Sequence, residues 1–262
     1  MTAARACAVA FPVLVFVALT SLESTARAQD EELILRPRHN SNESPQNFAM
    51  EVRIGPYKPQ IDNEASLKGA TPWADTFRDF SRVLVALEFD WQAIRIPYVG
   101  TLGPGVSIGY TTMSARARKL GSDQLSGDTT SLDVFPMYAV AVLRADVLMR
   151  QAGIPFVPYG KAGIGYVPWR TYTAGGTSSV TNSDGTTVAG KGQTWGWHFA
   201  LGLSFQLDII DSYAAKSMDT SVGINHTYLF GEWMFANYNG IGQEHPLLVG
   251  TSTWVTGLAF EF

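Results

Sequence analysis

The chain has 262 residues, of which 46% are hydrophobic, 12% are aromatic and 16% are charged, against about 25% charged in typical soluble domains. After the predicted leader described below, no segment reaches the about 18 unbroken apolar residues of a transmembrane helix, which excludes a helical membrane protein. The formal net charge of -4 argues against nucleic-acid binding, which requires a basic surface.

The N-terminus has the features of a secretory signal peptide. Arg5 supplies the positive charge, Cys7–Leu19 is almost wholly apolar, and Ala26–Ala28 provides the small-x-small cleavage pattern. The apolar stretch is shorter than the about 20 residues of a membrane-spanning helix, so a retained anchor is the weaker interpretation. We expect residues 1–28 to be removed. The mature chain then lacks cysteine, which excludes disulfides and thiolate metal sites.

A polar lead-in precedes the first predicted strand. Residues 29–46 show little apolar periodicity, and we interpret them as periplasmic. From Asn47 onward apolar residues recur with a period of two, which places them on one face of a β-strand. In the first such segment Phe48, Met50, Val52 and Ile54 alternate with Ala49, Glu51, Arg53 and Gly55. Residues 47–262 are therefore predicted to form one domain built from strands.

The clearest alternation runs from Trp195 to Leu207, with Trp, Phe or Leu at every second position. This length exceeds the about 5–6 residues of ordinary strands and suits the about 9–11 residues of an outer-membrane strand. Segments of similar character are Arg82–Trp91, Val106–Thr112, Leu132–Leu143, Val157–Trp169, Asn225–Tyr238 and Thr253–Phe262. Eight segments predict an all-β, eight-stranded antiparallel up-and-down transmembrane β-barrel, whose interior is only wide enough for side chains.

The connections between these segments alternate in character, which supports the same architecture. Four mostly long, polar connections are interpreted as external loops: Lys58–Ser81, Ala115–Thr129, Arg170–Gly192 and Asn239–Gly250. Three others are interpreted as periplasmic: Gln92–Leu102, Ala145–Phe156 and Ile209–Gly223, the last with a short helix over Ser212–Met218. The external loops are where an extracellular ligand, which the sequence does not identify, would bind.

The last strand carries the most specific signal. Gly257, Phe260 and Phe262 match the C-terminal pattern by which the outer-membrane assembly machinery recognises barrels, although Val255 occupies a usually polar position. The alternative is a soluble β-protein that ends on Phe, such as a secreted β-sandwich or a lipocalin-like binder. With the predicted signal peptide, this strand favours the bacterial outer membrane, with outer-membrane lipid and the assembly machinery as partners.

The segments Phe48–Pro59, Val157–Gly163, Gly223–Phe230 and Leu258–Phe262 resemble those of a myxobacterial outer-membrane β-barrel family. The resemblance extends over the whole predicted barrel. It implies the fold and the location. Because the family has no assigned activity, it implies no mechanism.

One pair of polar residues raises the possibility of an enzyme. His226 and Glu232 are six positions apart and therefore share a face of the predicted strand Asn225–Tyr238. Together with Thr227 they are the only near match to the catalytic triad of a barrel lipid hydrolase. A lipid A deacylase would have a serine two positions after the histidine, where this chain has Tyr228. A lumen-facing polar pair within a hydrogen-bonded network is the favoured interpretation.

Further polar side chains are expected to face the lumen: Glu51, Arg53, Glu88, Lys161, His198 and Asp208. Opposite charges inside a narrow barrel must pair, because an isolated buried charge is very costly. We interpret these residues as a polar core that closes the pore. Nucleotide-binding loops, zinc-protease motifs and calcium loops are absent from the sequence, so no cofactor and no metal is predicted.

The leading hypothesis is a small outer-membrane barrel with a structural or surface-interaction role and a lumen filled by side chains. A barrel enzyme acting on outer-membrane lipid is the first alternative. A narrow channel or a carrier of a small ligand is the second.

Overall fold

The computed structural model describes residues 47–118, 125–173, 175–181, 185–243 and 246–262. The predicted signal peptide (1–28) and lead-in (29–46) lie outside these residues. In chain order the elements are β1 (Phe48–Tyr57), η1 (Ile61–Asn63), η2 (Ala65–Leu67), α2 (Pro72–Phe77), β2 (Arg82–Trp91), β3 (Ile94–Ile96), β4 (Gly100–Arg118), β5 (Leu125–Val134), β6 (Met137–Arg144), α3 (Val147–Ala152), β7 (Phe156–Thr173), β8 (Gly176–Thr177), β9 (Ser179–Thr181), β10 (Thr187–Ala189), β11 (Lys191–Gln206), η3 (Leu207–Ile209), α4 (Ser212–Val222), β12 (His226–Asn237) and β13 (Thr251–Glu261).

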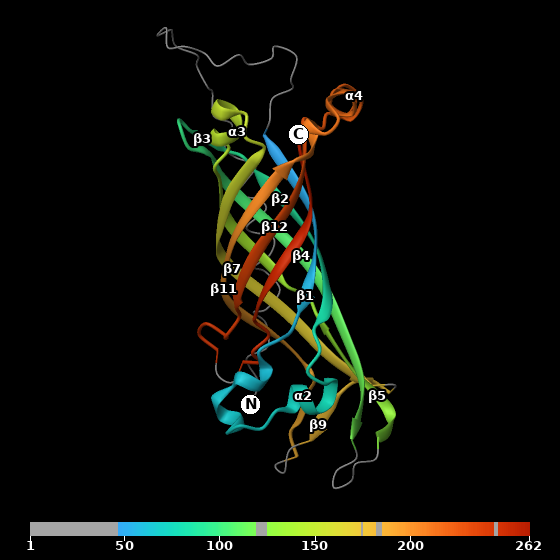
Figure 1. Ribbon diagram of the computed structural model, residues 1–262. Helices are drawn as coiled ribbons and strands as arrows, with labels where there is room; N and C mark the ends of the chain where they lie inside the picture. Colours follow the sequence, from blue (N-terminus) through green and yellow to red (C-terminus); the bar gives the residue numbers. More distant parts are fainter. Residues whose placement is uncertain (1–46, 119–124, 174, 182–184, 244–245) are drawn as a thin grey trace, which may run out of the picture. The chain divides into compact units, whose positions relative to one another are not determined.

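The long strands close into a barrel (Figure 1). Around the ring the order is β1, β2, β4, β5 with β6, β7, β11, β12 and β13, and β13 pairs with β1 to complete it. Every neighbouring pair is antiparallel. The predicted eight-stranded antiparallel up-and-down barrel is confirmed.

Strands β5 and β6 form one wall of the barrel with a local break at Pro136. Val134 pairs with Thr111 and Met137 pairs with Ile108 on β4, so the register continues unchanged across the break. Proline has no N–H to donate, which removes a hydrogen bond from the ladder at this point. The wall therefore counts as a single strand of the eight.

Side chains alternate between the outside and the lumen along the walls. On β1, Val52 and Ile54 are 43% and 48% exposed, whereas Glu51 and Arg53 are 1% and 2% exposed. Many outward residues of β2, β4, β11 and β12 are likewise large and apolar. An apolar band thus surrounds the barrel and charged groups fill part of its interior, the reverse of a soluble domain.

The two ends of the barrel differ (Figure 1). At one end the Asn47 N–H donates to the Phe262 carbonyl at 2.8 Å, and the connections there contain β3, α3 and α4. The opposite end carries η1, η2, α2 and the small β9–β10 hairpin. Within the described part of the chain, none of the helices has the length and apolar character needed to cross a membrane.

Two predicted external loops contain more strand than expected. β4 continues to Arg118 and β5 starts at Leu125, so most of the predicted loop Ala115–Thr129 is paired. In the same way, strands β7 and β11 extend into the predicted loop Arg170–Gly192. The reason is that strand formation depends on context: a neighbouring strand that offers backbone partners extends the pairing past the point where the apolar pattern stops.

Candidate functional site

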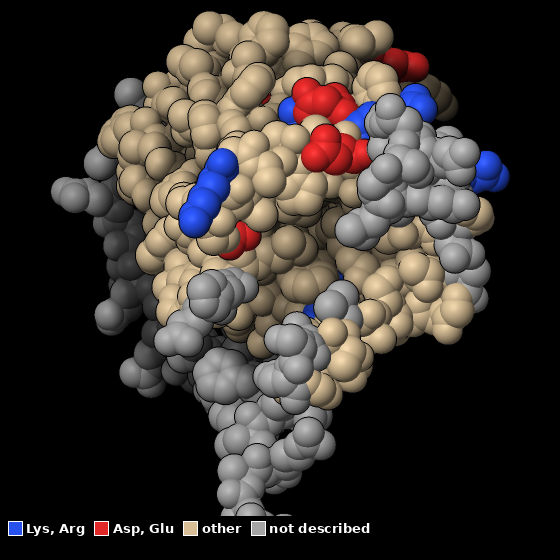
Figure 2. All heavy atoms as spheres, turned by 90° about the horizontal axis from the view of Figure 1, so that it is seen from below, with Lys and Arg blue, Asp and Glu red and all other residues tan. Residues whose placement is uncertain are grey.

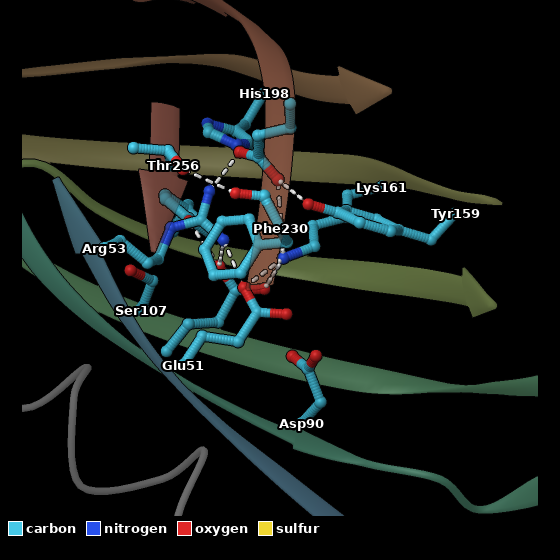
Figure 3. Close-up of polar contacts among 12 residues, drawn as sticks. Glu51, Arg53, Asp90, Ser107, Tyr159, Lys161, His198, Phe230 and Thr256 are labelled. Atoms are coloured by element: carbon cyan, nitrogen blue, oxygen red, sulfur yellow. Dashed lines mark hydrogen bonds and ion pairs between the residues drawn. The ribbon is translucent and has the colours of Figure 1, made fainter. Parts of the chain in front are cut away.

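Charged side chains from five strands meet in the lumen (Figure 3). They are Glu51 and Arg53 on β1, Glu88 and Asp90 on β2, Arg144 on β6, Lys161 on β7 and Glu232 on β12, and none is more than 5% exposed. We call these residues the lumen ion cluster. They meet because each occupies an inward position of its strand, and the registers place these positions at similar heights.

Each cation of the cluster bridges at least two carboxylates. Lys161 Nζ lies 2.8 Å from Glu51 Oε2 and 2.6 Å from Glu88 Oε1. Arg144 Nη2 lies 2.6 Å from Glu51 Oε1 and 2.8 Å from Asp90 Oδ2. Strand β7 is diametrically opposite β1 in the ring of eight, so the pair between Lys161 and Glu51 crosses the lumen.

Arg53 makes the third set of bridges. Its guanidinium pairs with Glu51 and Glu232 and lies 2.8 Å from Glu88 Oε2. It also lies 5.4 Å from the centre of the Phe230 ring, within reach of a cation–π interaction. The arginine therefore ties β1 to both β2 and β12.

Tyrosine hydroxyls complete the hydrogen bonding of the carboxylates. Tyr138 donates to Glu88, and Tyr159 donates to Glu232 at 2.9 Å. The cluster contains four carboxylates and three cations, and Asp90 Oδ1 has no hydrogen-bond partner in the described part of the chain. One acidic group is therefore in excess.

His198 lies at the edge of the cluster. Its ring stacks on Tyr138 with centroids 3.8 Å apart, and its Nδ1 is 2.9 Å from the Tyr238 hydroxyl. The Nε2 atom is buried and has no hydrogen-bond partner among the described residues. The imidazole ring of His198 thus fills the space between the ion cluster and the apolar part of the lumen.

Apolar side chains fill the lumen on the side of α2. Members of this packed group are Tyr57, Leu84, Met113, Leu132, Val134, Val167, Met234, Ala236, Tyr238, Val249 and Val255. Two α2 residues, Trp73 and Phe77, belong to the same group and are 2% and 8% exposed. A cavity of about 10 Å³, room for about one water molecule, separates this packing from Arg53. The lumen is therefore filled at both levels.

Helix α2 is fixed over the barrel mouth by an aspartate. Asp62 Oδ1 accepts the Trp73 N–H at 2.7 Å, and Oδ2 accepts the Ala74 N–H at 3.0 Å. These are N–H groups of the first turn, which have no partner within the helix. The carboxylate thus holds the helix in the orientation that points Trp73 into the barrel.

Three cluster carboxylates could in principle coordinate a cation. Ligand atoms of Glu51, Glu88 and Asp90 all lie within 4.8 Å of one another. The space between the glutamates, however, holds the Lys161 ammonium, which already contacts both. The cluster is therefore internally paired rather than arranged around an ion.

Five of the six residues predicted to face the lumen are placed there by the structure, and Asp208 is not. Glu51, Arg53, Glu88 and Lys161 belong to the ion cluster and His198 borders it. Asp208 lies beyond the end of β11, in η3, because the strand stops at Gln206 and the alternation no longer applies. Asp90 and Arg144 were not predicted as lumen residues, although Asp90 lies two residues after Glu88 on the same face.

The structure separates the two residues considered for catalysis. His226 Nδ1 is 2.5 Å from Asp208 Oδ2 and 3.0 Å from Gln206 Nε2, whereas Glu232 pairs with Arg53. Six residues of strand correspond to about 20 Å. These partners of His226 within the described part of the chain, Asp208 and Gln206, include no serine, and His226 and Glu232 do not come together as the catalytic hypothesis required.

The terminal strand packs as the alternation predicted. Trp254 and Leu258 on β13 face outward, at 52% and 41% exposed. Phe260 follows on the same face, and the backbone of Phe262 pairs with that of Phe48. Gly257 faces inward, where a Cβ would lie 1.9 Å from the Val52 carbonyl oxygen. Strands β1 and β13 therefore approach closely only because this position has no side chain.

Comparisons with known proteins found similar solved structures but no family. No protein-family model matches the chain, and no curated protein matches it. Similar solved structures include the outer membrane protein OprG from Pseudomonas aeruginosa, at 13% identity over 84% of this chain and 98% of that one, with a TM-score of 0.43. Ail, the attachment invasion locus protein of Yersinia pestis, is 12% identical over 84% of this chain and 99% of its own, with a TM-score of 0.40. The N-terminal β-barrel domain of P. aeruginosa OprF is 10% identical over 83% and 100%, with a TM-score of 0.36. Identities this low assign no function, so the site has to be interpreted from its own chemistry.

Proposed function

We propose that the protein is a closed barrel of the bacterial outer membrane, with a structural or surface-interaction role and no open pore. The observation that carries the proposal is the lumen ion cluster, in which Lys161 on β7 reaches across to Glu51 on β1. The apolar packing beneath α2 adds a second closed level. A solute would have to break several buried ion pairs to pass, and each unpaired buried charge is very costly.

The outer surface supports the membrane location. Large apolar side chains such as Leu87 on β2 and Phe199 and Leu201 on β11 are 51%, 46% and 69% exposed. A continuous apolar band of this kind is stable against lipid and unstable in water. Outer-membrane lipid is accordingly proposed as the partner of this band, and the assembly machinery as the partner of Gly257, Phe260 and Phe262 during insertion.

Conductance in a planar lipid bilayer tests the closed lumen. The purified full chain should insert, shown by faster gel migration of unboiled than of boiled samples, and should give no stable conductance steps. The matched variant E51A/E88A/R144A/K161A removes two acidic and two basic groups, so it keeps the cluster's charge while shortening the side chains that cross the lumen. Conductance that is seen in the variant but not in the unmodified protein supports the proposal. Open steps in the unmodified protein overturn it.

A further inference from the structure

A groove lined by arginines lies between α2 and the extended part of β4. It has a volume of about 750 Å³, and its charged lining residues are Arg78, Arg82, Arg116 and Asp75. We call it the arginine groove. Figure 2 looks onto this end of the barrel, where charged side chains are scattered over a largely uncharged surface. Three guanidinium groups against one carboxylate make the groove positively charged.

Two of these arginines have no acidic partner within the part of the chain that the structure describes. Arg78 and Arg116 are exposed, and among the described residues neither forms an ion pair. Two other cations at this end are paired: Arg170 Nη2 lies 3.0 Å from Asp133, and Lys58 pairs with Asp79. The positive charge of the groove is therefore available to a ligand.

The backbone of Arg78 is held in a strained conformation. Its φ of 62° and ψ of 163° fall in a region that is essentially restricted to glycine. The residue directly follows α2, and Arg82 Nη2 donates to the Phe77 carbonyl at 3.0 Å beside it. The chain thus places an arginine at the groove where a glycine would fit without strain.

The groove follows directly from the apolar band of the barrel. Along the outward face of β4, Ile108 is 53% and Tyr110 is 44% exposed, and Thr112, Ser114 and Arg116 follow. Six residues of strand, tilted by about 40°, place Arg116 about 15 Å above Tyr110. Phe80, which lines the groove, is 59% exposed. The surface therefore passes from apolar to aromatic to polar to cationic, as a lipid does from acyl chain to headgroup.

We propose that the arginine groove binds the phosphate groups of an outer-leaflet glycolipid, whose acyl chains pack on the apolar band below. Guanidinium groups bind phosphate through paired N–H donors, which makes arginine well suited to this ligand. The continuity with the apolar band favours a lipid over a soluble anion. The inference rests on the proposed outer-membrane location, because only there does the groove face such a lipid.

Lipid binding by matched variants tests the inference. The purified full chain in uncharged detergent is titrated with diphosphoryl lipid A and with its fully dephosphorylated form, and bound lipid is measured by native mass spectrometry. R78Q/R116Q removes two charges from the groove, and K68Q/K191Q removes two charges from exposed positions outside the groove lining. We expect the first variant to bind the diphosphoryl form about 30-fold more weakly and the second to bind like the unmodified protein.

Several outcomes would overturn the inference. Equal loss in both variants would mean general charge attraction, and equal affinity for both lipid forms would mean that the phosphates are not recognised. Inorganic phosphate that competes at the concentration of the lipid would assign the groove to a soluble anion. Gel mobility and bilayer conductance of the same samples report the proposed function separately, so a closed, inserted barrel that ignores lipid phosphate would contradict this inference alone.

Discussion

Glu51 on β1 and Glu88 on β2 stand directly opposite one another, and the Lys161 ammonium lies between them, 2.8 Å from one and 2.6 Å from the other. Like charges directly opposite on neighbouring strands repel, so this register is stable only when a cation is placed between them. The lysine comes from the far side of the barrel, and its position therefore depends on closure of the sheet.

Replacing this lysine should destabilise the barrel strongly. We expect K161M to lower the free energy of unfolding by about 3–5 kcal/mol, because it removes the cation that lies between two buried carboxylates and leaves their repulsion less compensated. Urea unfolding in detergent micelles, followed by tryptophan fluorescence, measures the change. The variant E51Q/E88Q/K161M removes the repulsion as well and should recover most of the loss. A K161M barrel as stable as the unmodified protein would refute the bridging role.

Helix α2 should be dispensable for closure of the lumen. W73A/F77A removes the two side chains that α2 inserts into the barrel. Because this truncates the packing, we expect the free energy of unfolding to fall by about 3 kcal/mol or more. The region 58–81 should then become sensitive to added protease. Conductance should stay at baseline because the ion cluster remains. Open steps in this variant would show that α2, rather than the cluster, closes the barrel.

Gly257 should tolerate no side chain. In G257A the new Cβ would lie 1.9 Å from the Val52 carbonyl oxygen, and this backbone atom cannot move without moving its strand. We therefore expect the free energy of unfolding to fall by about 2–3 kcal/mol. The temperature at which unboiled samples lose their fast gel migration should fall accordingly. G231A is the matched control, because nothing lies within 4 Å of its Cβ, and it should change stability by less than about 0.5 kcal/mol.

Asp208 should contribute stability that disappears in acid. Burial acts to raise its pKa, but hydrogen bonds from His226, Gln206 and the Thr227 N–H lower it below the ordinary 3.8. A carboxyl whose folded pKa is depressed stabilises the fold above its unfolded pKa of about 4, and that contribution is lost as the pH falls through the folded value.

The stability difference between the unmodified protein and D208N should therefore be present at pH 7 and shrink below about pH 4. Thermal unfolding across this pH range measures it. H226Q serves as the control, because Gln206 and Thr227 still donate to the carboxylate, so part of the acid-dependent step should remain. A difference that does not change with pH would contradict the assignment.

Replacing Arg78 with glycine should raise the stability of the protein and weaken its binding of lipid phosphate. R78G relieves a strained backbone, which we expect to raise the free energy of unfolding by about 1 kcal/mol or more, while it removes one cation from the arginine groove. R78Q retains the strain and removes the same charge. Lipid phosphate binding should therefore weaken in both variants, and only R78G should unfold at a higher urea concentration.

The sequence by itself determined the barrel and, on the strands with a clear alternation, the two faces of each strand. The alternation of Phe48, Met50 and Val52 with Glu51 and Arg53 assigns two faces, because successive side chains of a strand point in opposite directions. An apolar outer face with charges inside is incompatible with a soluble domain of ordinary composition. The number of strands and their order around the barrel then followed from counting the segments along the chain.

Only the tertiary structure decided which charges meet and where the alternation ends. Arg144 was missed because both faces of Leu132–Leu143 are apolar, and its position depends on pairing with Thr101 and Tyr159 on neighbouring strands. Asp208 was misplaced because the end of β11 is set by the turn into η3. The bridge of Lys161 to Glu51 and the groove beside α2 join residues far apart in the chain. Such contacts depend on register and closure around the whole ring, which no local pattern of residues specifies.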